Sequence, residues 1–257
     1  MRAYRIIDSM VSKLAVVIPF YNMWHLTHAR LYELYRNIEV GIDIVLVDDA
    51  FTEKPEIDGG IAWWQKQVKK HSIRYYRNKE NLGFGGSCNK GARVAFENVG
   101  ADAIIFLSND VIVGGNFVSP ILSILETTPN VLIGGQIVDW KAGWNQFMYQ
   151  GKEIVIPYAA GWLLACTKDV WEKLGGFDPI FGRFDYEDVD LSTTAIVSGI
   201  ELKGLNISYL KHLSGATIAT LPIDRMAETV KNKQKYVEKW EGRWSEIIER
   251  LEKSHGT

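Results

Sequence analysis

Hydrophobic residues in the first half of the chain follow two alternating patterns, which are short continuous runs and longer stretches at helical spacing. The continuous runs predict buried strands at Leu14–Ile18, Ile42–Val47, Ile73–Tyr76 and Ala103–Leu107. The spaced stretches predict helices at Trp24–Ile38, Ile61–Lys70 and Gly86–Val99. Strands that alternate with helices are typical of βαβ units, so we expect an α/β fold with a Rossmann-like, mixed, mostly parallel central sheet flanked by helices.

The second half of the chain is less regular. Apolar runs predict strands at Val131–Val138 and Gly161–Cys166, and helical patterns cover Lys168–Leu174 and Glu187–Ser198. The aromatic residues of Trp140–Tyr158 show no clear period, so we interpret this segment as a loop.

A separate amphipathic pattern begins at Arg225. Apolar residues recur at helical spacing from Met226 to Leu251, interrupted by Gly242, and predict one amphipathic helix or two. We therefore divide the chain into a main domain at residues 1–222 and a C-terminal helical extension at residues 223–257. The apolar face of the extension is expected to pack on the main domain, to form a homo-oligomer with a second copy, or merely to cover the sheet edge.

The composition restricts the classes of partner and compartment. A chain of 257 residues, 47% of them hydrophobic, can bury a sizeable core. Its formal net charge of −2 gives no electrostatic reason to expect nucleic acid as a partner. Two cysteines, Cys88 and Cys166, are too few for a disulfide framework and favour a reducing compartment. We find no signal peptide and no transmembrane segment, and expect a cytoplasmic protein, with peripheral membrane association left open.

Polar residues stand at the ends of two predicted strands. Asp48 and Asp49 follow one strand, and Asn109 and Asp110 follow another, at the sheet edge where open α/β folds bind ligands. A carboxylate there can accept hydrogen bonds from a nucleobase imide and from ribose hydroxyls, although one of two adjacent acids could instead cap the next element. Asp110 suits a divalent cation, which prefers hard oxygen ligands.

His212 is a candidate second ligand for such a cation, and the alternative is a structural histidine. Leu213, Ser214 and Gly215 follow it and predict a turn rather than a core strand, which favours the ligand interpretation.

A glycine-rich segment from Asn81 to Gly91 leads into a predicted helix. Neither phosphate-binding fingerprint fits it. Cys88 replaces the third glycine of the dinucleotide pattern, and Ala92 and Arg93 stand where a P-loop needs Lys followed by Ser or Thr. The segment is therefore either a structural turn or a backbone that passes close to a ligand or a neighbouring strand.

Five carboxylates lie within a short span near the middle of the second half: Asp178, Asp185, Glu187, Asp188 and Asp190. A helix N-terminus stabilises anions, but this effect accounts for only one or two of them. A general base for an alcohol needs an ionised carboxylate within hydrogen-bond reach. Glu187 and Asp188 point about 100° apart on a helix, so only one of them can face a given site.

In this order the motifs resemble the family 2 inverting glycosyltransferases, which have a GT-A fold. The segments that carry the resemblance run across roughly residues 14 to 215: Val16 to Asn22, Val47 to Ala50, Asn81 to Gly83, Asn89 to Gly91, Leu107 to Asp110, Gly175 to Asp178, Glu187 with Asp188, and His212. At Leu107 to Asp110, only the last acid of the family's Asp-x-Asp metal motif is present.

The resemblance implies a role for each matched position. The residues that it places against the nucleotide sugar are Pro19, Tyr21, Asn22, Asp48, Asp49, Asn81, Gly83, Asn89 and Asn109. Asp110 and His212 would hold Mn²⁺ or Mg²⁺. Asp188 would act as the general base, while Glu187 would anchor its loop or bind the acceptor.

The implied reaction is a single displacement that inverts the anomeric carbon. It moves a hexosyl or deoxyhexosyl group from a UDP- or dTDP-sugar to a hydroxyl of a glycan or another acceptor, in polysaccharide or glycoconjugate synthesis. The loops from Trp140 to Tyr158 and from Phe181 to Tyr186 are where we expect acceptor contacts.

Two other classes compete with this interpretation. A nucleotidyltransferase would be expected to carry a basic, glycine-rich triphosphate loop after the first strand, and the segment from Pro19 to Asn22 offers none. A catalytically silent sugar-binding module of the same fold would have no physical need to retain Asp49, Asp110, Asp188 and His212 together.

Overall fold

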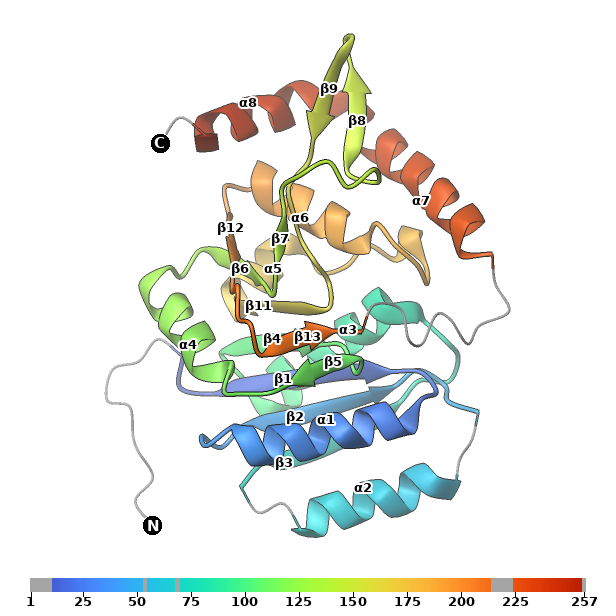
Figure 1. The fold of residues 1–257 in the computed structure, drawn as a ribbon, viewed down its shortest axis with the longest axis vertical. Coiled ribbons are helices and arrows are strands. Elements are labelled where there is room, and N and C mark those ends of the chain that lie inside the picture. The colour runs from blue at the N-terminus through green and yellow to red at the C-terminus, as the bar shows by residue number, and fades with distance from the viewer. Residues whose placement is uncertain (1–10, 53–54, 68–69, 214–223, 256–257) are drawn as a thin grey trace.

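A seven-stranded sheet forms the centre of the computed structural model, which describes residues 11–52, 55–67, 70–213 and 224–255 (Figure 1). Its strands are β1 (Leu14–Phe20), β2 (Asp43–Asp48), β3 (Ser72–Arg77), β4 (Ala103–Leu107), β6 (Val131–Gly134), β11 (Leu163–Thr167) and β12 (Glu201–Gly204). They lie in the order β12-β6-β11-β4-β1-β2-β3. Every neighbouring pair is parallel except the two pairs that β11 makes, so the predicted mixed, mostly parallel sheet is confirmed.

Helices flank this sheet, as predicted. Those before residue 200 are α1 (Trp24–Asn37), α2 (Pro55–Gln67), α3 (Gly83–Arg93), α4 (Val118–Thr127), α5 (Lys168–Leu174) and α6 (Glu187–Val197). The helix α2 begins earlier than predicted because proline suits a first helical turn. The helix α3 also begins earlier, at its glycines, and continues into a π-helix at Val94–Val99. Tertiary packing outweighs the low helix propensity of glycine here, since a Cβ on Gly91 would lie 2.2 Å from Val17 of β1.

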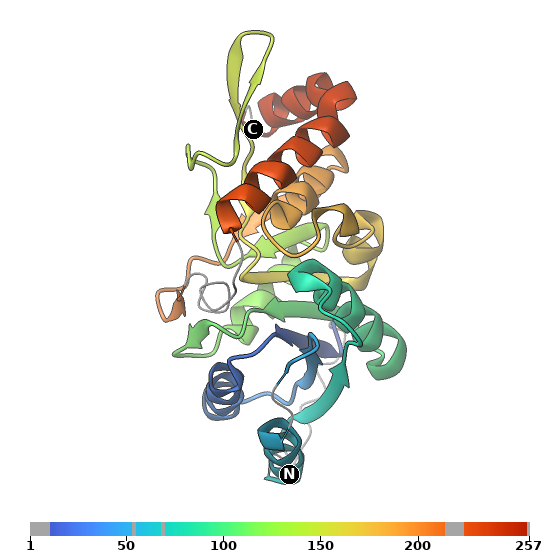
Figure 2. The ribbon, with the colours of Figure 1, turned by 90° about the vertical axis from the view of Figure 1, so that its right-hand side faces the viewer.

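The two faces of the sheet carry separate apolar clusters, because successive residues of a strand point to opposite sides. In β1, Val16 and Ile18 pack with residues of α1 and α4, whereas Ala15 and Val17 pack with residues of α3, α5 and α6. Figure 2 shows α1 and α3 on opposite sides of the sheet. This layering leaves the carboxyl ends of β1, β2 and β4 at a common edge.

One predicted strand is divided in two. The segment Val131–Val138 contains β6 and then β7 (Ile137–Val138), which pairs with β10 (Tyr158–Ala159) in a separate small sheet. Between them the backbone passes so close to Trp162 that a Cβ at Gly135 would lie 2.1 Å from its ring. Only a glycine lets the backbone pass this close to that ring.

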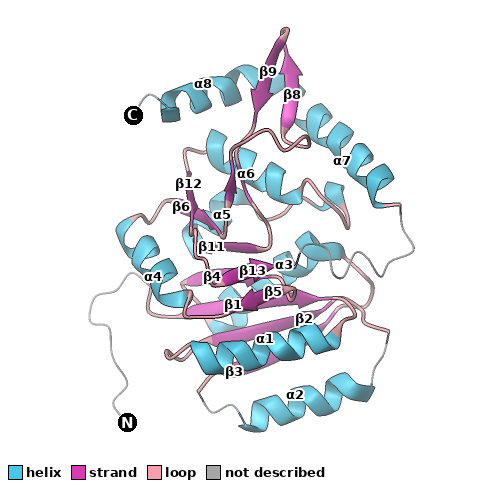
Figure 3. Cartoon of the chain, viewed as in Figure 1, coloured by secondary structure: helices cyan, strands magenta, loops and turns pink. Residues whose placement is uncertain are grey.

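The predicted loop at Trp140–Tyr158 is wrong in its central part. There, β8 (Gln146–Tyr149) and β9 (Lys152–Val155) form an antiparallel hairpin that projects beyond the helices (Figure 3). Its turn residues, Gln150 and Gly151, have φ angles of 49° and 75°, which match the twist of paired strands. The aromatic residues of the whole segment show no single period because the segment contains two short strands and the turn between them.

The C-terminal extension forms two helices, α7 (Arg225–Trp240) and α8 (Trp244–His255), joined by a short 3-10 turn that contains Gly242. Its residues from Tyr236 to Leu251 share a third apolar cluster with the β8–β9 hairpin and α6, so the predicted packing on the main domain is confirmed for this part. Met226, Val230 and Val237 of the predicted apolar face are exposed instead. The boundary predicted at residue 222 lies outside the described residues. None of the described helices has the length and apolar character needed to cross a membrane.

Candidate active site

Strand pairing brings Asp110 and His212 together at the carboxyl edge of the sheet. Asp110 follows β4, and the next residues form β5 (Val111–Val113), which pairs with β13 (Leu210–His212) in antiparallel fashion. The Nε2 atom of His212 lies 3.2 Å from Oδ1 of Asp110. His212 therefore ends a strand, and most of the turn predicted from Leu213, Ser214 and Gly215 lies outside the described residues. The predicted proximity of its side chain to Asp110 is present in the structure.

The surroundings of this pair orient both side chains. The hydroxyl of Ser108 donates a hydrogen bond of 2.6 Å to Oδ1 of Asp110. The imidazole of His212 stacks on the indole of Trp162, with 5.7 Å between ring centroids and 19° between ring planes. Within the described residues, no group of three or more His, Cys, Asp or Glu side chains could hold a metal ion. A carboxylate and an imidazole are nevertheless ligands that Mn²⁺ accepts, with further oxygens left to the substrate or water.

Side chains of the helix α1 form hydrogen bonds with the backbone of β5. The guanidinium of Arg30 donates to the carbonyl of Val111, and the carboxylate of Glu33 accepts from the amide of Val113 at 2.6 Å. The amide of Asn37 donates to the carbonyl of Val113, also at 2.6 Å. The strand that begins directly after Asp110 is therefore fixed on both sides, by β13 and by α1. Asn109, predicted to contact the donor, is buried, and its amide donates to Thr27 of α1 at 3.1 Å.

The adjacent acids Asp48 and Asp49 are both engaged within the protein. Asp48 is fully buried, and it accepts hydrogen bonds from the Tyr75 hydroxyl at 2.5 Å and from a backbone amide, besides an ion pair with Arg77 at 3.4 Å. Asp49 accepts from the backbone amides of Leu82 at 2.7 Å and of the next residue at 2.9 Å. The two carboxylates thus join the end of β2 to β3 and to the glycine-rich segment. Their contact with a nucleoside stays a prediction.

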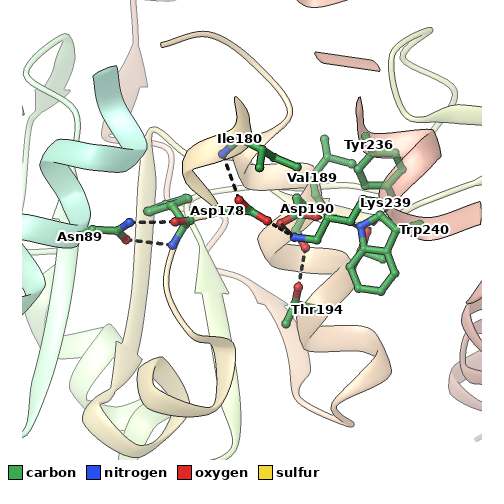
Figure 4. Close-up of polar contacts among 11 residues, drawn as sticks. Asn89, Asp178, Ile180, Val189, Asp190, Thr194, Tyr236, Lys239 and Trp240 are labelled. Carbon is green, nitrogen blue, oxygen red and sulfur yellow. Dashed lines mark hydrogen bonds and ion pairs between the residues drawn. The ribbon is translucent and has the colours of Figure 1, made fainter. Parts of the chain in front are cut away.

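The glycine-rich segment fits closely against another part of the chain. Gly83 has a φ of 76°, and a Cβ there would lie 2.6 Å from the Cα of Arg183. Asn81 accepts a hydrogen bond from the amide of Gly83 at 3.1 Å. Asn89 bonds the backbone of Phe177 twice, as donor at 2.8 Å and as acceptor at 2.9 Å (Figure 4). In the described structure, these residues join α3 to the loop that precedes α6, and their donor contacts stay predictions.

The end of β1 lies beside Asp48 and Asp49. Pro19 is buried in the strand, whereas Tyr21 and Asn22 are half-buried in the turn that follows. The amide of Asp49 donates to the carbonyl of Phe20 at 2.8 Å, which ties the two strand ends together. The sequence-predicted residues of β1, β2 and β4 thus share one edge of the sheet.

Glu187 and Asp188 open α6 and point in different directions, as helical geometry predicts. The Cβ of Glu187 lies near Gly85, at 3.7 Å from the position that a Cβ there would take, so Glu187 faces α3. Asp188 faces the segment that leads into β11, where its Oδ2 accepts from the amide of Gly161 at 2.9 Å. Its Oδ1 accepts from the amide of Val189, also at 2.9 Å.

Burial raises the pKa of both acids, and it raises that of Glu187 further. For Glu187, the neighbouring charge of Asp188 adds to the effect of burial, and Oε2 is buried without a hydrogen-bond partner. For Asp188, the backbone amides of Gly161 and Val189 stabilise the anion and offset part of the effect on its pKa. No described Lys or Arg forms an ion pair with either acid.

A continuous set of contacts connects Asp188 to the Asp110–His212 pair. Asp188 accepts from the amide of Gly161, and the next residue, Trp162, stacks on His212. The carbonyl of Trp162 also accepts from the amide of Ser108 at 2.9 Å. The base candidate and the metal-ligand candidates therefore border the same segment, although they come from α6, β4 and β13.

Comparison with known proteins assigns the chain to a family. The profile described as "Glycosyl transferase family 2" matches residues 15–185, which is more than half of the chain. The chain belongs to glycosyl transferase family 2. It is a glycosyltransferase with a GT-A fold.

Relatives of this family 2 glycosyltransferase include uncharacterized proteins of Mycobacterium tuberculosis and Mycobacterium bovis. Each is 26% identical over 217 residues, which cover 80% of this chain and 76% of the relative. Among solved structures, GalNAc-T7 with UDP, GalNAc and Mn²⁺ matches with a TM-score of 0.64 at 18% identity, over 90% of this chain and 48% of that chain. A Pyrobaculum calidifontis mannosyltransferase with GDP-Man and Mn²⁺ matches with a TM-score of 0.57 at 17% identity, over 75% and 54%. The chain spans about half the length of these two solved chains.

The structure gives specific places near the site to Trp162, which the sequence did not single out, and to Tyr158, which ends a segment expected to carry acceptor contacts. Trp162 lies within a predicted strand, and its sequence position gives no sign of the stack on His212. Tyr158 approaches the acids of α6, and burial followed by the charge of Asp188 raises its pKa. The sequence offers one weak signal for both, since they lie within three residues of Gly161, and the backbone at a glycine can pass close to a neighbouring group.

Proposed function

We propose that this family 2 glycosyltransferase moves a sugar from a nucleoside-diphosphate sugar, of the UDP or dTDP type, to a hydroxyl acceptor with inversion at the anomeric carbon. The observation that carries the proposal is the placement of Asp188. Its carboxylate borders the segment that also carries Trp162, which stacks on His212 beside Asp110. A base and a pair of metal ligands that border the same segment are what a single displacement needs.

Asp188 is the better base of the two adjacent acids. A general base must be ionised before it accepts a proton. The two backbone amides that donate to Asp188 favour its anion, whereas the unpartnered oxygen of Glu187 favours a protonated carboxyl. In the proposed step, the acceptor proton moves to Asp188 as the acceptor oxygen bonds to the anomeric carbon. The bond from that carbon to the diphosphate breaks, and its electron pair leaves with the nucleoside diphosphate.

Asp110 and His212 are the residues that would hold a divalent cation. Their donor atoms lie 3.2 Å apart at the strand ends, so both could bind the same cation. When bound, Mn²⁺ or Mg²⁺ supplies charge neutralisation of the leaving group. The Mn²⁺ and nucleotides named for the two solved structures support this part of the proposal.

An exposed tryptophan supports a glycan as the acceptor. Trp144 is 50% exposed, yet its indole N–H donates to the Tyr158 hydroxyl at 2.6 Å. Its carbonyl accepts from the Tyr186 hydroxyl, also at 2.6 Å. Tyr186 directly precedes the acids of α6, so the ring is fixed close to the proposed base. An ordered aromatic face can pack against the apolar face of a pyranose, which favours a glycan acceptor. We include in the proposal a hexosyl or deoxyhexosyl transfer in polysaccharide or glycoconjugate synthesis, as the family resemblance implies.

The proposed compartment is the cytoplasm. Cys88 and Cys166 are both buried and free, which fits a reducing environment. Peripheral attachment to a membrane and a homo-oligomer that uses the C-terminal extension are compatible with this location and belong to the same proposal.

A ligand screen tests the proposed function. The purified chain is heated with uridine, deoxythymidine or guanosine diphosphate sugars, each with Mn²⁺ and with excess chelator. Ligands that bind only the folded chain raise its melting temperature. We expect stabilisation and slow hydrolysis with a uridine or deoxythymidine sugar only when Mn²⁺ is present.

The matched variant is Asp110→Ala, which removes one proposed metal ligand from an otherwise supported strand end. We expect it to fold normally and to lose transfer by about 10³-fold, since metal catalysis is worth several kcal/mol. Full turnover of the wild-type chain in excess chelator would contradict the proposed metal. Stabilisation of the wild-type chain by guanosine diphosphate sugars alone would contradict the proposed donor.

A further inference from the structure

The helix α7 neutralises three of the five carboxylates that lie between residues 178 and 190. The ammonium of Lys239 bridges Asp178 at 2.6 Å and Asp190 at 2.8 Å (Figure 4). The indole N–H of Trp240 donates to the other oxygen of Asp190 at 2.8 Å. Arg225, in the first turn of α7, pairs with Asp185 at 2.8 Å. Among the described residues, only Glu187 and Asp188 of these five form no ion pair, although Arg225 lies close enough to lower the pKa of Glu187.

The same helix holds a strained turn in front of those acids. Asp185 and Tyr186 have φ angles of 53° and 76°, in the left-handed region that residues other than glycine rarely adopt. Such a conformation persists only where the surrounding structure over-determines it. The next two residues are the proposed base and its neighbour, so the direction of the first turn of α6 depends on this geometry.

Asn232 is the central contact between α7 and the strained turn. Its side chain is buried, and its amide nitrogen donates to the carbonyls of Phe181, Phe184 and Asp185. The hydroxyl of Thr229, one turn earlier on α7, donates to the carboxylate of Asp185. A single face of α7 therefore bonds the backbone and the side chain of the turn at several points.

An aromatic contact completes this support. The ring of Tyr186 lies 5.7 Å from that of Tyr236, between centroids, and the Tyr236 hydroxyl bonds Thr193 of α6 at 2.6 Å. The helix α7 thus contacts the turn, its aromatic side chain and the body of α6. A helix that only covered apolar surface would not need buried polar contacts, because each of them is costly when imperfectly made.

We propose that α7 is a positioning element of the active site: Asn232 holds the turn at Asp185 and Tyr186, and Lys239 ties Asp178 to Asp190 of α6, so that Asp188 faces the acceptor. This inference rests on the proposed function. Asn232 and Lys239 touch neither substrate nor reacting atoms, and they act through the loop and α6. The C-terminal extension is then a part of the catalytic unit.

The test compares Asn232→Ala and Lys239→Met with two controls on the exposed side of α7, Gln234→Ala and Lys231→Met. The described side-chain contacts of Gln234 and Lys231 are with residues of α7 itself, Glu238 and Glu228. Turnover, UDP affinity in the presence of Mn²⁺, melting temperature and amide exchange of residues 178–190 are measured for each protein. All comparisons are made well below the melting temperature of the least stable variant.

We expect Asn232→Ala to lower turnover by about 10- to 100-fold, since small displacements of a catalytic group have effects of this size. Affinity for UDP should stay within about twofold, because no donor contact is lost. Amide exchange should accelerate at residues 181–188 and not in the central sheet. Lys239→Arg should restore most of the turnover that Lys239→Met loses, and both controls should behave as wild type.

A variant that melts earlier but keeps wild-type turnover and wild-type exchange at residues 181–188 would overturn the inference and reduce α7 to a structural cover. If the wild-type chain processes no nucleotide sugar, the proposed function fails, and the exchange measurement still decides whether α7 holds the turn. Should Lys239→Met fail to fold because Asp190 is left buried without its cation, Asn232→Ala carries the test.

Discussion

The proposed metal end of the site, at Asp110 and His212, and its proposed base end, at Asp188, are built in different ways. Asp110 and His212 meet because β5 and β13 pair through their backbones, with α1 bonded to the other side of β5. Asp188 follows a strained turn that side chains of α7 hold from a distant part of the chain. Backbone pairing tolerates most side-chain changes, whereas a turn held by a few side chains does not. The base end should therefore be the more sensitive to single substitutions that lie outside the site.

The largest expected difference within the base end separates Asp188 from Glu187. Asp188→Asn should lower transfer by about 10²- to 10⁴-fold, the usual range for loss of a general base, while UDP and Mn²⁺ still bind. Glu187→Gln should be much milder, because its unpartnered carboxyl is the one favoured in the protonated form. Steady-state rates of the two amide variants decide the assignment. An inactive Glu187→Gln beside an active Asp188→Asn would reverse the two roles.

At the metal end, we expect a smaller effect from His212→Ala. The strand pairing of β13 does not depend on the imidazole, so the fold should persist. Loss of one of two protein ligands should raise the Mn²⁺ concentration needed for half-maximal activity by about tenfold or more. A Mn²⁺ titration of donor hydrolysis measures this, with Lys211→Ala on the same strand as the control. A titration identical to wild type would return His212 to a structural role.

The smallest effect concerns stability at the base end. Burial raises the pKa of Glu187 in the folded chain, so the unfolded chain binds fewer protons between the ordinary and the raised pKa values. The free energy of unfolding contributed by this group therefore falls as pH rises through that interval. At about pH 8, the Glu187→Gln variant should have a melting temperature a few degrees above that of wild type, which corresponds to a gain of about 1 kcal/mol in the free energy of unfolding. This gain should shrink toward about pH 5. A gain that is the same at both pH values would show that the carboxyl is not titrating there.

Element types in the first half of the chain could be predicted because their periods are clear. The run at Leu14–Ile18 is buried on both faces, and the helical spacing of α1 matches the apolar cluster that it joins. The hairpin of β8 and β9 was not predicted because its strands are only four residues long and lie in a segment whose aromatic residues show no regular spacing. The three residues of β5 gave too short a pattern to identify a strand at all.

The sequence could identify single residues of the candidate site but not the contacts that arrange them in space. The resemblance identified Asp110, His212 and Asp188, but not the ring of Trp162 that lies between them. Asp49 was expected to face a ligand, whereas in the described structure it bonds the amides of Leu82 and Gly83. An isolated carboxylate has the same sequence signature whether it binds a ligand or a backbone amide.

The sequence by itself determined the GT-A family, the parallel sheet and the five acids ahead of and within the start of α6. These depend on local periods and on the order of motifs, which a single chain displays directly. Only the tertiary structure decided which acids are free to act. The helix α7, far along the chain, pairs Asp178, Asp185 and Asp190 with Lys239 and Arg225, while Glu187 and Asp188 form no ion pair within the part of the chain that the structure describes. The charge state of a carboxylate depends on burial and on neighbours in space, and no sequence period records either of them.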